Sequence, residues 1–327
     1  YTHQIISDAI GDCLACMQGK MTRYSHPQKS IVERKERLDG PAGSSVAMDY
    51  NSFGEPSKFG NWKHALTAVT YDNNDTRVYT ELLVDKTYDN VLLAIVSIIN
   101  KIRRRLPPGM PLSVLDMTTD EDTSLISKKL QVAIGPMQVT IHSCTPHEHQ
   151  TNGRAEVTIR ILTTLTRTYL AYSKLHHGLW PFAYMTAVFN LNNFPRRVLN
   201  WKSSNNINNI DYSNAMLMPW GSTVLIHTPV NQRPGGKLDS AARPAIFMHY
   251  NVSNSNVLSY KVMDIQSGQM LTRSDMIVLD AGPFNKGRIR QLTQQSSHEL
   301  ALSYLHPPFT PSCGCPPAQS TFDPHTG

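Results

Sequence analysis

The chain has 327 residues, of which 40% are hydrophobic, so it can bury a sizeable core and form two domains with tails. No apolar run approaches the length of a membrane span and no basic-then-apolar signal peptide opens the chain, so we expect no membrane partner. A net charge of +6 mildly favours anionic partners, and five cysteines without an obvious disulfide framework favour a reducing compartment.

Residues 1–42 are polar and lack clear periodicity. They contain Cys13 and Cys16, whose spacing suits two thiolates on one Zn²⁺, although a structural zinc site needs four ligands. Only one histidine, His3, lies upstream of these cysteines, so whether this half-site binds zinc stays open. The basic run that follows is typical of a solvated linker.

Residues 43–202 alternate between strand-like and helical patterns. Strand-like runs lie at 45–50, 64–71, 76–84, 112–116 and 137–142. Helical periodicity marks residues 87–106, more weakly 122–134, and then 152–174 and 179–200. This order predicts an α/β core with a mixed sheet.

Beyond residue 202 the composition changes. Asn and Ser dominate 203–221, which is typical of a linker. Short strand-like runs then predict a small β-barrel or sheet over 222–282, with strands near 223–227, 245–250, 257–263 and 270–279. Residues 283–327 are rich in Pro, Gln and Ser, and we expect them to be disordered.

Three acidic residues stand at spacings that suit one catalytic site. Asp49 ends the first predicted strand, while Asp120 and Glu156 have 35 residues between them. Carboxylates brought together repel one another unless a divalent cation lies between them. Oxygen-only ligand sets suit Mg²⁺ or Mn²⁺, and two such ions can clamp the attacking and leaving oxygens of a phosphodiester. The pattern therefore favours metal-dependent phosphoryl transfer on nucleic acid.

The helix predicted at 152–174 supports this interpretation. Its polar face carries Glu156, Arg160, Thr163 and Arg167, and we expect the opposite side to pack on a sheet through Val157, Ile161, Leu165 and Leu170. The simpler alternative is an amphipathic helix with an ion pair between Glu156 and Arg160. Candidate nucleic-acid contacts on this segment are Asn152, Arg154, Arg160 and Arg167.

The preceding loop, 142–150, contains three histidines and Cys144. Its spacing matches no common zinc module, so a loop bordering the active site is the preferred interpretation.

Several motifs occur in a specific order along the chain. They are Cys13-x2-Cys16-x2-Gly19-Lys20; Met48-Asp49 followed by Phe53-Gly54-Glu55-Pro56; Thr145-Pro146-His147-Glu148-His149-Gln150-Thr151-Asn152-Gly153-Arg154-Ala155-Glu156; Leu179-Trp180-Pro181-Phe182-Ala183; Asn192-Asn193-Phe194-Pro195; Lys237-Leu238-Asp239; and Ala245-Ile246-Phe247-Met248-His249-Tyr250. With these motifs the chain resembles, over about residues 11–280, the integrase of copia-type LTR retrotransposons (pseudoviruses), within the retroviral-integrase superfamily.

The resemblance implies an RNase H-like core with a mixed five-stranded sheet and flanking helices, in which Asp49, Asp120 and Glu156 hold two Mg²⁺ ions. It implies 3′-end processing of element cDNA and strand transfer into target DNA, by a homo-oligomer released from a Gag-Pol polyprotein beside other Gag-Pol products. Residues 1–42 would be the remnant of an amino-terminal zinc module. The expected location is the nucleus, after a cytoplasmic particle stage.

The chain departs from the family pattern at the second acidic position. The family usually has Asp-x-Gly-x-Glu-Phe there, whereas this chain reads Asp120-Glu121-Asp122-Thr123-Ser124-Leu125. Asp116 and Asp122 therefore remain alternatives to Asp120 as second ligand. Two competing functions also remain: a catalytically decayed nucleic-acid-binding relic of the same fold, and a metal-dependent nuclease that hydrolyses without joining.

Overall fold

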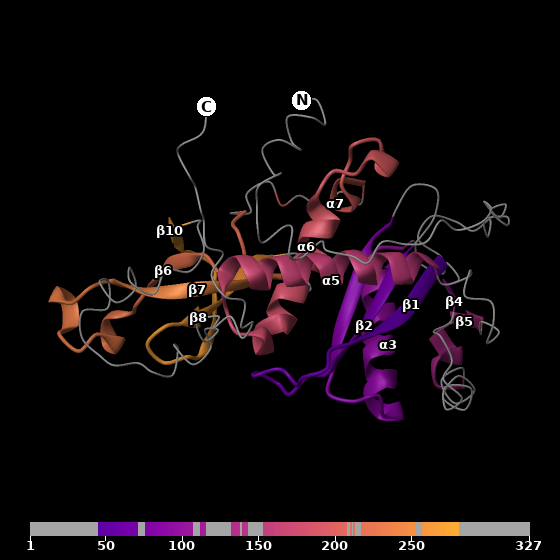
Figure 1. Ribbon diagram of the computed structural model, residues 1–327, viewed down its shortest axis with the longest axis horizontal. Coiled ribbons are helices and arrows are strands. Elements are labelled where there is room, and N and C mark those ends of the chain that lie inside the picture. Colours follow the sequence, from indigo (N-terminus) through magenta and orange to yellow (C-terminus); the bar gives the residue numbers. More distant parts are fainter. Residues whose placement is uncertain are drawn as a thin grey trace, which may run out of the picture.

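The computed structural model describes residues 45–70, 76–106, 112–115, 132–137, 139–142, 153–207, 210, 212, 217–252 and 257–280. Within these residues the chain forms two five-stranded sheets, with long helices packed on the first (Figure 1). Residues 1–42 and 283–327, predicted as a zinc-module remnant and a disordered tail, lie outside the described part.

The first sheet has the strand order β3-β2-β1-β4-β5. Its strands are β1 (Ser45–Ser52), β2 (His64–Thr70), β3 (Val78–Leu83), β4 (Leu112–Leu115) and β5 (Val139–His142). β1 is antiparallel to β2 and parallel to β4, so the sheet is mixed. The predicted RNase H-like core with a mixed five-stranded sheet and flanking helices is confirmed.

Helices cover both faces of this sheet (Figure 1). α3 (Tyr88–Arg103) buries its isoleucines against one face, together with Val46 and Met48 of β1. α5 (Gly153–Ser173) and α6 (Trp180–Asn193) pack on the other face. Successive strand side chains point to opposite faces, so β1 directs Met48 towards α3 and Asp49 towards α5 and α6. No helix in the described part is long and apolar enough to cross a membrane.

Two predicted helices differ from the structure or fall outside it. The helix predicted over 179–200 ends at Asn193, because Phe194 precedes Pro195 and takes an extended conformation with φ −79° and ψ 137°. A 3₁₀ turn, η3 (Arg197–Leu199), follows it. The helix predicted at 122–134 lies mostly outside the described residues.

The end of α6 is fixed to the edge strand of the first sheet. The Asn192 side chain donates from Nδ2 to the Val78 carbonyl at 2.7 Å and accepts from the Val78 N–H at 2.9 Å. The buried amide thus satisfies backbone groups of β3 that no further strand pairs. Asn192 of the Asn192-Asn193 motif therefore has a structural role, since its side chain joins α6 to β3.

The second sheet has the order β10-β6-β7-β8-β9, with antiparallel neighbours. Its strands are β6 (Thr223–His227), β7 (Ala242–Val252), β8 (Leu258–Asp264), β9 (Met270–Arg273) and β10 (Ile277–Asp280). β7 is central, and its residues are buried from Pro244 to Tyr250. The small β-rich carboxy-terminal module is therefore present. Between β6 and β7, a segment with the short turns η4 (Val230–Gln232) and η5 (Gly236–Leu238) projects from the sheet (Figure 1).

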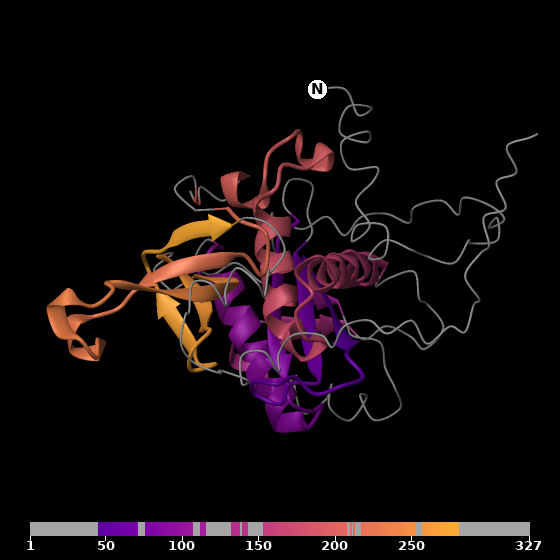
Figure 2. The same cartoon turned by 60° about the vertical axis from the view of Figure 1, so that its left-hand side comes forward.

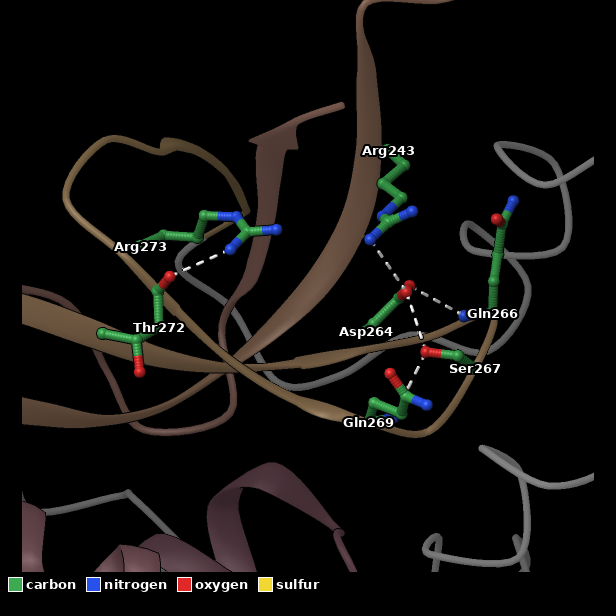
Figure 3. Close-up of polar contacts among 7 residues, drawn as sticks. All are labelled: Arg243, Asp264, Gln266, Ser267, Gln269, Thr272 and Arg273. Carbon is green, nitrogen blue, oxygen red and sulfur yellow. Dashed lines mark hydrogen bonds and ion pairs between the residues drawn. The ribbon is translucent and has the colours of Figure 1, made fainter. Parts of the chain in front are cut away.

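A buried carboxylate holds the turn between β8 and β9 (Figure 3). Asp264 is 2% exposed and accepts hydrogen bonds from the Gln266 N–H at 3.1 Å and the Ser267 hydroxyl at 2.9 Å. Arg243 of β7 forms an ion pair with it at 3.3 Å. These contacts give Asp264 a structural role in this turn.

The two sheets share one hydrophobic cluster, with α6 between them (Figure 2). The cluster joins Ala65 of β2 and Trp180 of α6 to Met248 of β7. The Met248 carbonyl accepts hydrogen bonds from the Thr186 hydroxyl at 3.1 Å and from Trp220 Nε1 at 2.6 Å. Trp220 belongs to the segment predicted as a linker, 203–221, and is buried in the same cluster.

Candidate active site at the edge of the first sheet

The parallel strands β1, β4 and β5 end at one edge of the first sheet. Ala47 pairs with Leu115, the last residue of β4, and Leu115 pairs with His142, the last residue of β5. Asp49 lies two residues beyond Ala47 on β1. Ligands of open α/β sheets commonly bind outside the carboxyl ends of parallel strands. This edge is therefore the candidate active site.

Asp49 lies beside a buried group of hydroxyl and amide side chains. Its Oδ1 accepts a hydrogen bond from the Tyr50 N–H at 2.7 Å, and it is paired across the strands with Thr67. The Thr67 hydroxyl lies 2.8 Å from the Tyr184 hydroxyl of α6. Burial raises the pKa of Tyr184 to about 12, while hydrogen bonds to Thr67 and Asn51 oppose the rise and the Asp49 charge adds to it. Tyr184 is therefore a neutral phenol at physiological pH.

A hydrogen bond joins α5 to β1 on the same face. Asn51 Nδ2 donates to Thr163 Oγ1 at 2.8 Å. Asp49 and Asn51 lie two residues apart, about 7 Å, on that face of β1. Glu156 precedes Thr163 by two helical turns, about 10 Å, on the same flank of α5. β1 and the first half of α5 therefore carry Asp49 and Glu156 on the same side of the sheet.

The amino-terminal half of α5 presents charged side chains to solvent. Arg154, Glu156 and Arg160 are exposed, and Arg167 is exposed further along the helix. The Arg167 guanidinium lies 3.4 Å from the Thr164 hydroxyl, which itself donates to the Arg160 carbonyl at 2.8 Å. The exposed side of α5 thus carries a carboxylate and three guanidinium groups, which is compatible with a phosphate-rich ligand.

The predicted apolar face of α5 is correct in part. Leu170 is buried and Leu165 packs against the same hydrophobic cluster, as expected. Val157 and Ile161, expected to pack on the sheet, are 44% and 41% exposed. The buried stripe instead includes Ala155, Leu162 and Thr166. Thr166 tolerates burial because its hydroxyl donates to the Leu162 carbonyl at 2.7 Å, so no polar group is left unsatisfied.

The remaining predicted site residues lie outside the described part of the chain. They are Asp120 with its alternatives Asp116 and Asp122, Asn152, and the cysteines Cys13 and Cys16. Asp116 directly follows Leu115, the end of β4. The choice of Asp120 as second ligand, with Asp116 and Asp122 as alternatives, therefore stays a prediction.

The ligand chemistry of the described residues fits a hard divalent cation. No group of three His, Cys, Asp or Glu residues that could hold a metal is formed among them, and they include two of the predicted ligands, Asp49 and Glu156. Carboxylate oxygens suit Mg²⁺ or Mn²⁺. Asp85, in the connection between β3 and α3, has a structural role: hydrogen bonds from Thr87 and Asn90 lower its pKa to about 2.

Sequence reasoning missed the residues that support Asp49: Asn51, Thr67, Tyr184 and, as a contact to the sheet, Thr163. The alternation of β1 could have placed Asn51 on the same face as Asp49. The contact between Thr67 and Tyr184 joins residues 117 positions apart and has no local signal.

No family model matches this chain. Among solved structures, it is similar to a chain of the simian T-cell lymphotropic virus intasome in complex with PP2A regulatory subunit B56 gamma, with 14% identity and a TM-score of 0.43, over 85% of this chain and 89% of that chain. It is also similar to the catalytic core domain of BIV integrase, with 14% identity and a TM-score of 0.37, over 50% of this chain and 93% of that chain. At this identity and superposition, neither likeness assigns a function to the chain.

Proposed function

We propose that this chain is a polynucleotidyl transferase of the integrase type, which inserts element cDNA into target DNA by 3′-end processing and strand transfer. One observation supports the proposal most strongly. Asp49 on β1 and Glu156 on α5 belong to two elements that the hydrogen bond between Asn51 and Thr163 holds together, on one side of an RNase H-like sheet.

In this proposal Asp49 and Glu156, together with Asp120, would hold Mg²⁺ or Mn²⁺. When bound, the ions would stabilise the attacking and leaving oxygens of a phosphodiester. Asn51 bridges the strand and the helix and so keeps the two carboxylates on fixed backbones. The neutral Tyr184 hydroxyl maintains the buried contact with Thr67 beneath them.

The DNA backbone would bind along α5. Arg154, Arg160 and Arg167 are exposed there, and Asn152 directly precedes the helix. Guanidinium groups form charge-assisted hydrogen bonds with phosphate oxygens, which position the duplex without reading its sequence.

The proposal extends to the origin and setting of the chain. The chain would be the integrase of a copia-type LTR retrotransposon, cut from a Gag-Pol polyprotein and acting as a homo-oligomer in the nucleus after a cytoplasmic particle stage. Binding of Zn²⁺ by Cys13 and Cys16 is part of the same proposal.

Two other functions compete with it. The replaced residues around Asp120 favour a nucleic-acid-binding relic that no longer catalyses. A metal-dependent nuclease would use the same carboxylates with water alone.

Strand transfer tests the proposal. The full chain is incubated in Mn²⁺ or Mg²⁺ with a short blunt duplex matching the element terminus and a plasmid target. Wild type is compared with Glu156→Gln, Asp120→Asn and Asp275→Asn. The last variant changes an exposed carboxylate in the connection between β9 and β10. We expect joined product from wild type and Asp275→Asn, and none from the other two variants.

The other outcomes separate the alternatives. Cleavage without joining would favour the nuclease, and absence of product from folded, DNA-binding protein would favour the relic. Product from Asp120→Asn but not from Glu156→Gln would move the second ligand to Asp116 or Asp122.

A further inference from the structure

A basic cavity lies where the first sheet meets the second. Its volume is about 370 Å³, and the end of α3, strand β3, helix α6 and strand β7 contribute to its walls. This size falls within the range of small-ligand sites. β3 is the edge strand, two strands away from β1, or about 10 Å across the sheet, so the cavity is apart from Asp49.

Positive charge dominates the wall. Arg77, Lys101, Arg104 and Arg105 line the cavity, and its described lining contains no carboxylate. Lys101 is partly neutralised by Glu81, with its Nζ 2.5 Å from Oε1. Gathering several cations at one half-enclosed surface is unfavourable unless an anion offsets the repulsion. The cavity is therefore suited to an anionic ligand.

One aromatic ring, that of Tyr79, contacts two of these cations. The guanidinium carbons of Arg77 and Arg105 lie 5.7 and 5.5 Å from the centre of the Tyr79 ring, and Arg105 Nη1 donates to the Tyr79 hydroxyl at 3.1 Å. Burial raises the pKa of the Tyr212 hydroxyl, and the charges of Arg77 and Arg105 oppose that rise. Both guanidinium groups therefore lie close enough to Tyr212 to act on it electrostatically.

Two buried polar atoms of the lining have no hydrogen-bond partner among the described residues: the Tyr212 hydroxyl and Asn205 Oδ1. The orientation of the Asn205 amide is fixed, because its Nδ2 donates to Asn193 Oδ1 at 2.7 Å. A buried donor and a buried acceptor without partners are unfavourable unless a ligand satisfies them. A hydroxyl can bind a phosphate oxygen, and a carbonyl oxygen can accept from a sugar hydroxyl or from a base.

The cavity also has an aromatic wall that could contact a planar ring. Tyr250 stacks on Phe189 with ring centroids 4.0 Å apart, and Tyr212 packs against Phe189 at 5.6 Å. Nucleobases stack readily on such side chains.

We infer that this cavity binds a nucleoside phosphate, either free or as the last residue of a nucleic-acid strand. Its phosphate would lie against Arg77, Arg104 and Arg105, and its ring beside Tyr212. This site goes beyond the proposed function, because it uses none of the carboxylates at the edge of the first sheet.

Isothermal titration of the full chain tests the inference, in buffer containing EDTA so that the result is independent of any metal at Asp49. The probes are AMP, inorganic phosphate and a single-stranded tetradeoxyadenylate. We expect Arg105→Gln to weaken AMP binding by about tenfold or more, through loss of a charge-assisted contact. Arg197→Gln, which changes an exposed arginine outside the cavity, should leave the affinity within about twofold of wild type.

Because Arg105 also contacts Tyr79, Arg105→Gln could lower stability, so a second variant is needed. Tyr212→Phe removes a hydroxyl that has no partner within the described residues. It should weaken AMP binding several-fold without lowering the melting temperature. Binding of AMP and of the oligonucleotide would place a strand end in the cavity, whereas binding of AMP alone would indicate a free nucleotide.

Two results would overturn the inference. One is the absence of AMP and oligonucleotide binding by folded wild type. The other is phosphate binding as tightly as AMP, with no effect of Tyr212→Phe.

Discussion

His249 is a neutral, buried histidine in the central strand of the second sheet. Its Nδ1 donates to the Tyr250 carbonyl at 2.7 Å, and its ring stacks on Phe182 with centroids 5.8 Å apart. Burial lowers its pKa to about 4. The folded protein must therefore bury an imidazolium, or open, if the pH falls far enough to protonate this residue.

The sign of the pH dependence follows from this depressed pKa. His249 contributes stability that is fully present above its unfolded pKa near 6.5 and is lost as the pH falls towards 4. As the pH is lowered from 7.5 to 5.0, we expect the contribution of His249 to reduce the free energy of unfolding of wild type by roughly 2 kcal/mol. His249→Asn should flatten this part of the curve, as measured by urea unfolding. His227→Asn changes an exposed histidine and should leave the pH dependence as in wild type. If the unfolding free energy of His249→Asn fell with pH as steeply as that of wild type, His249 would not be the group responsible.

At the scale of elements, α5 depends on packing of one stripe that includes Leu162. Leu162 is fully buried, whereas its neighbour Ile161 is 41% exposed. Leu162→Ala should lower the free energy of unfolding by roughly 3 kcal/mol, through lost burial and the cavity left behind. Ile161→Ala should cost well under half of that. Denaturant unfolding of the two variants measures the difference, and a larger loss for Ile161→Ala would restore the orientation expected from sequence.

These elements show how far sequence reasoning reaches. Short strand-like runs, of which the third alternates and is rich in β-branched residues, predicted β1, β2 and β3 within about two residues at each end, because a strand of this kind has a local sequence pattern. The buried stripe of α5 was predicted correctly at Leu165 and Leu170 but not at Val157 and Ile161. Thr166 is buried instead, with its hydroxyl satisfied inside the helix, so a polar residue takes a position that the pattern assigns to an apolar one. The helical pattern over 179–200 did not predict that α6 ends at Asn193, where Phe194 becomes extended before Pro195. Asp49 and Glu156 were proposed as ligands from their spacing, and their role stays a prediction, whereas the contact between Thr67 and Tyr184 depends on tertiary folding and has no local signal.

At the scale of the whole molecule, one hydrophobic cluster joins the two sheets through α6. Met248 is fully buried in it, and its carbonyl binds both Thr186 and Trp220. The two sheets should therefore unfold together, and far-UV circular dichroism and tryptophan fluorescence should follow one denaturant transition. Met248→Ala should shift both signals by an amount equivalent to roughly 2–5 kcal/mol. Two separate transitions, with only one shifted by the variant, would show that the sheets are independent.

The most direct test of the central claim is Mn²⁺ binding to the folded chain, followed by electron paramagnetic resonance of the free ion. If Asp49 on β1 and Glu156 on α5 act as one site, Asp49→Asn and Glu156→Gln should each weaken binding by about tenfold or more, because each removes a charged ligand. Asp275→Asn should leave the affinity unchanged. Binding that is unaffected by either Asp49→Asn or Glu156→Gln would contradict a shared metal site at this edge of the sheet.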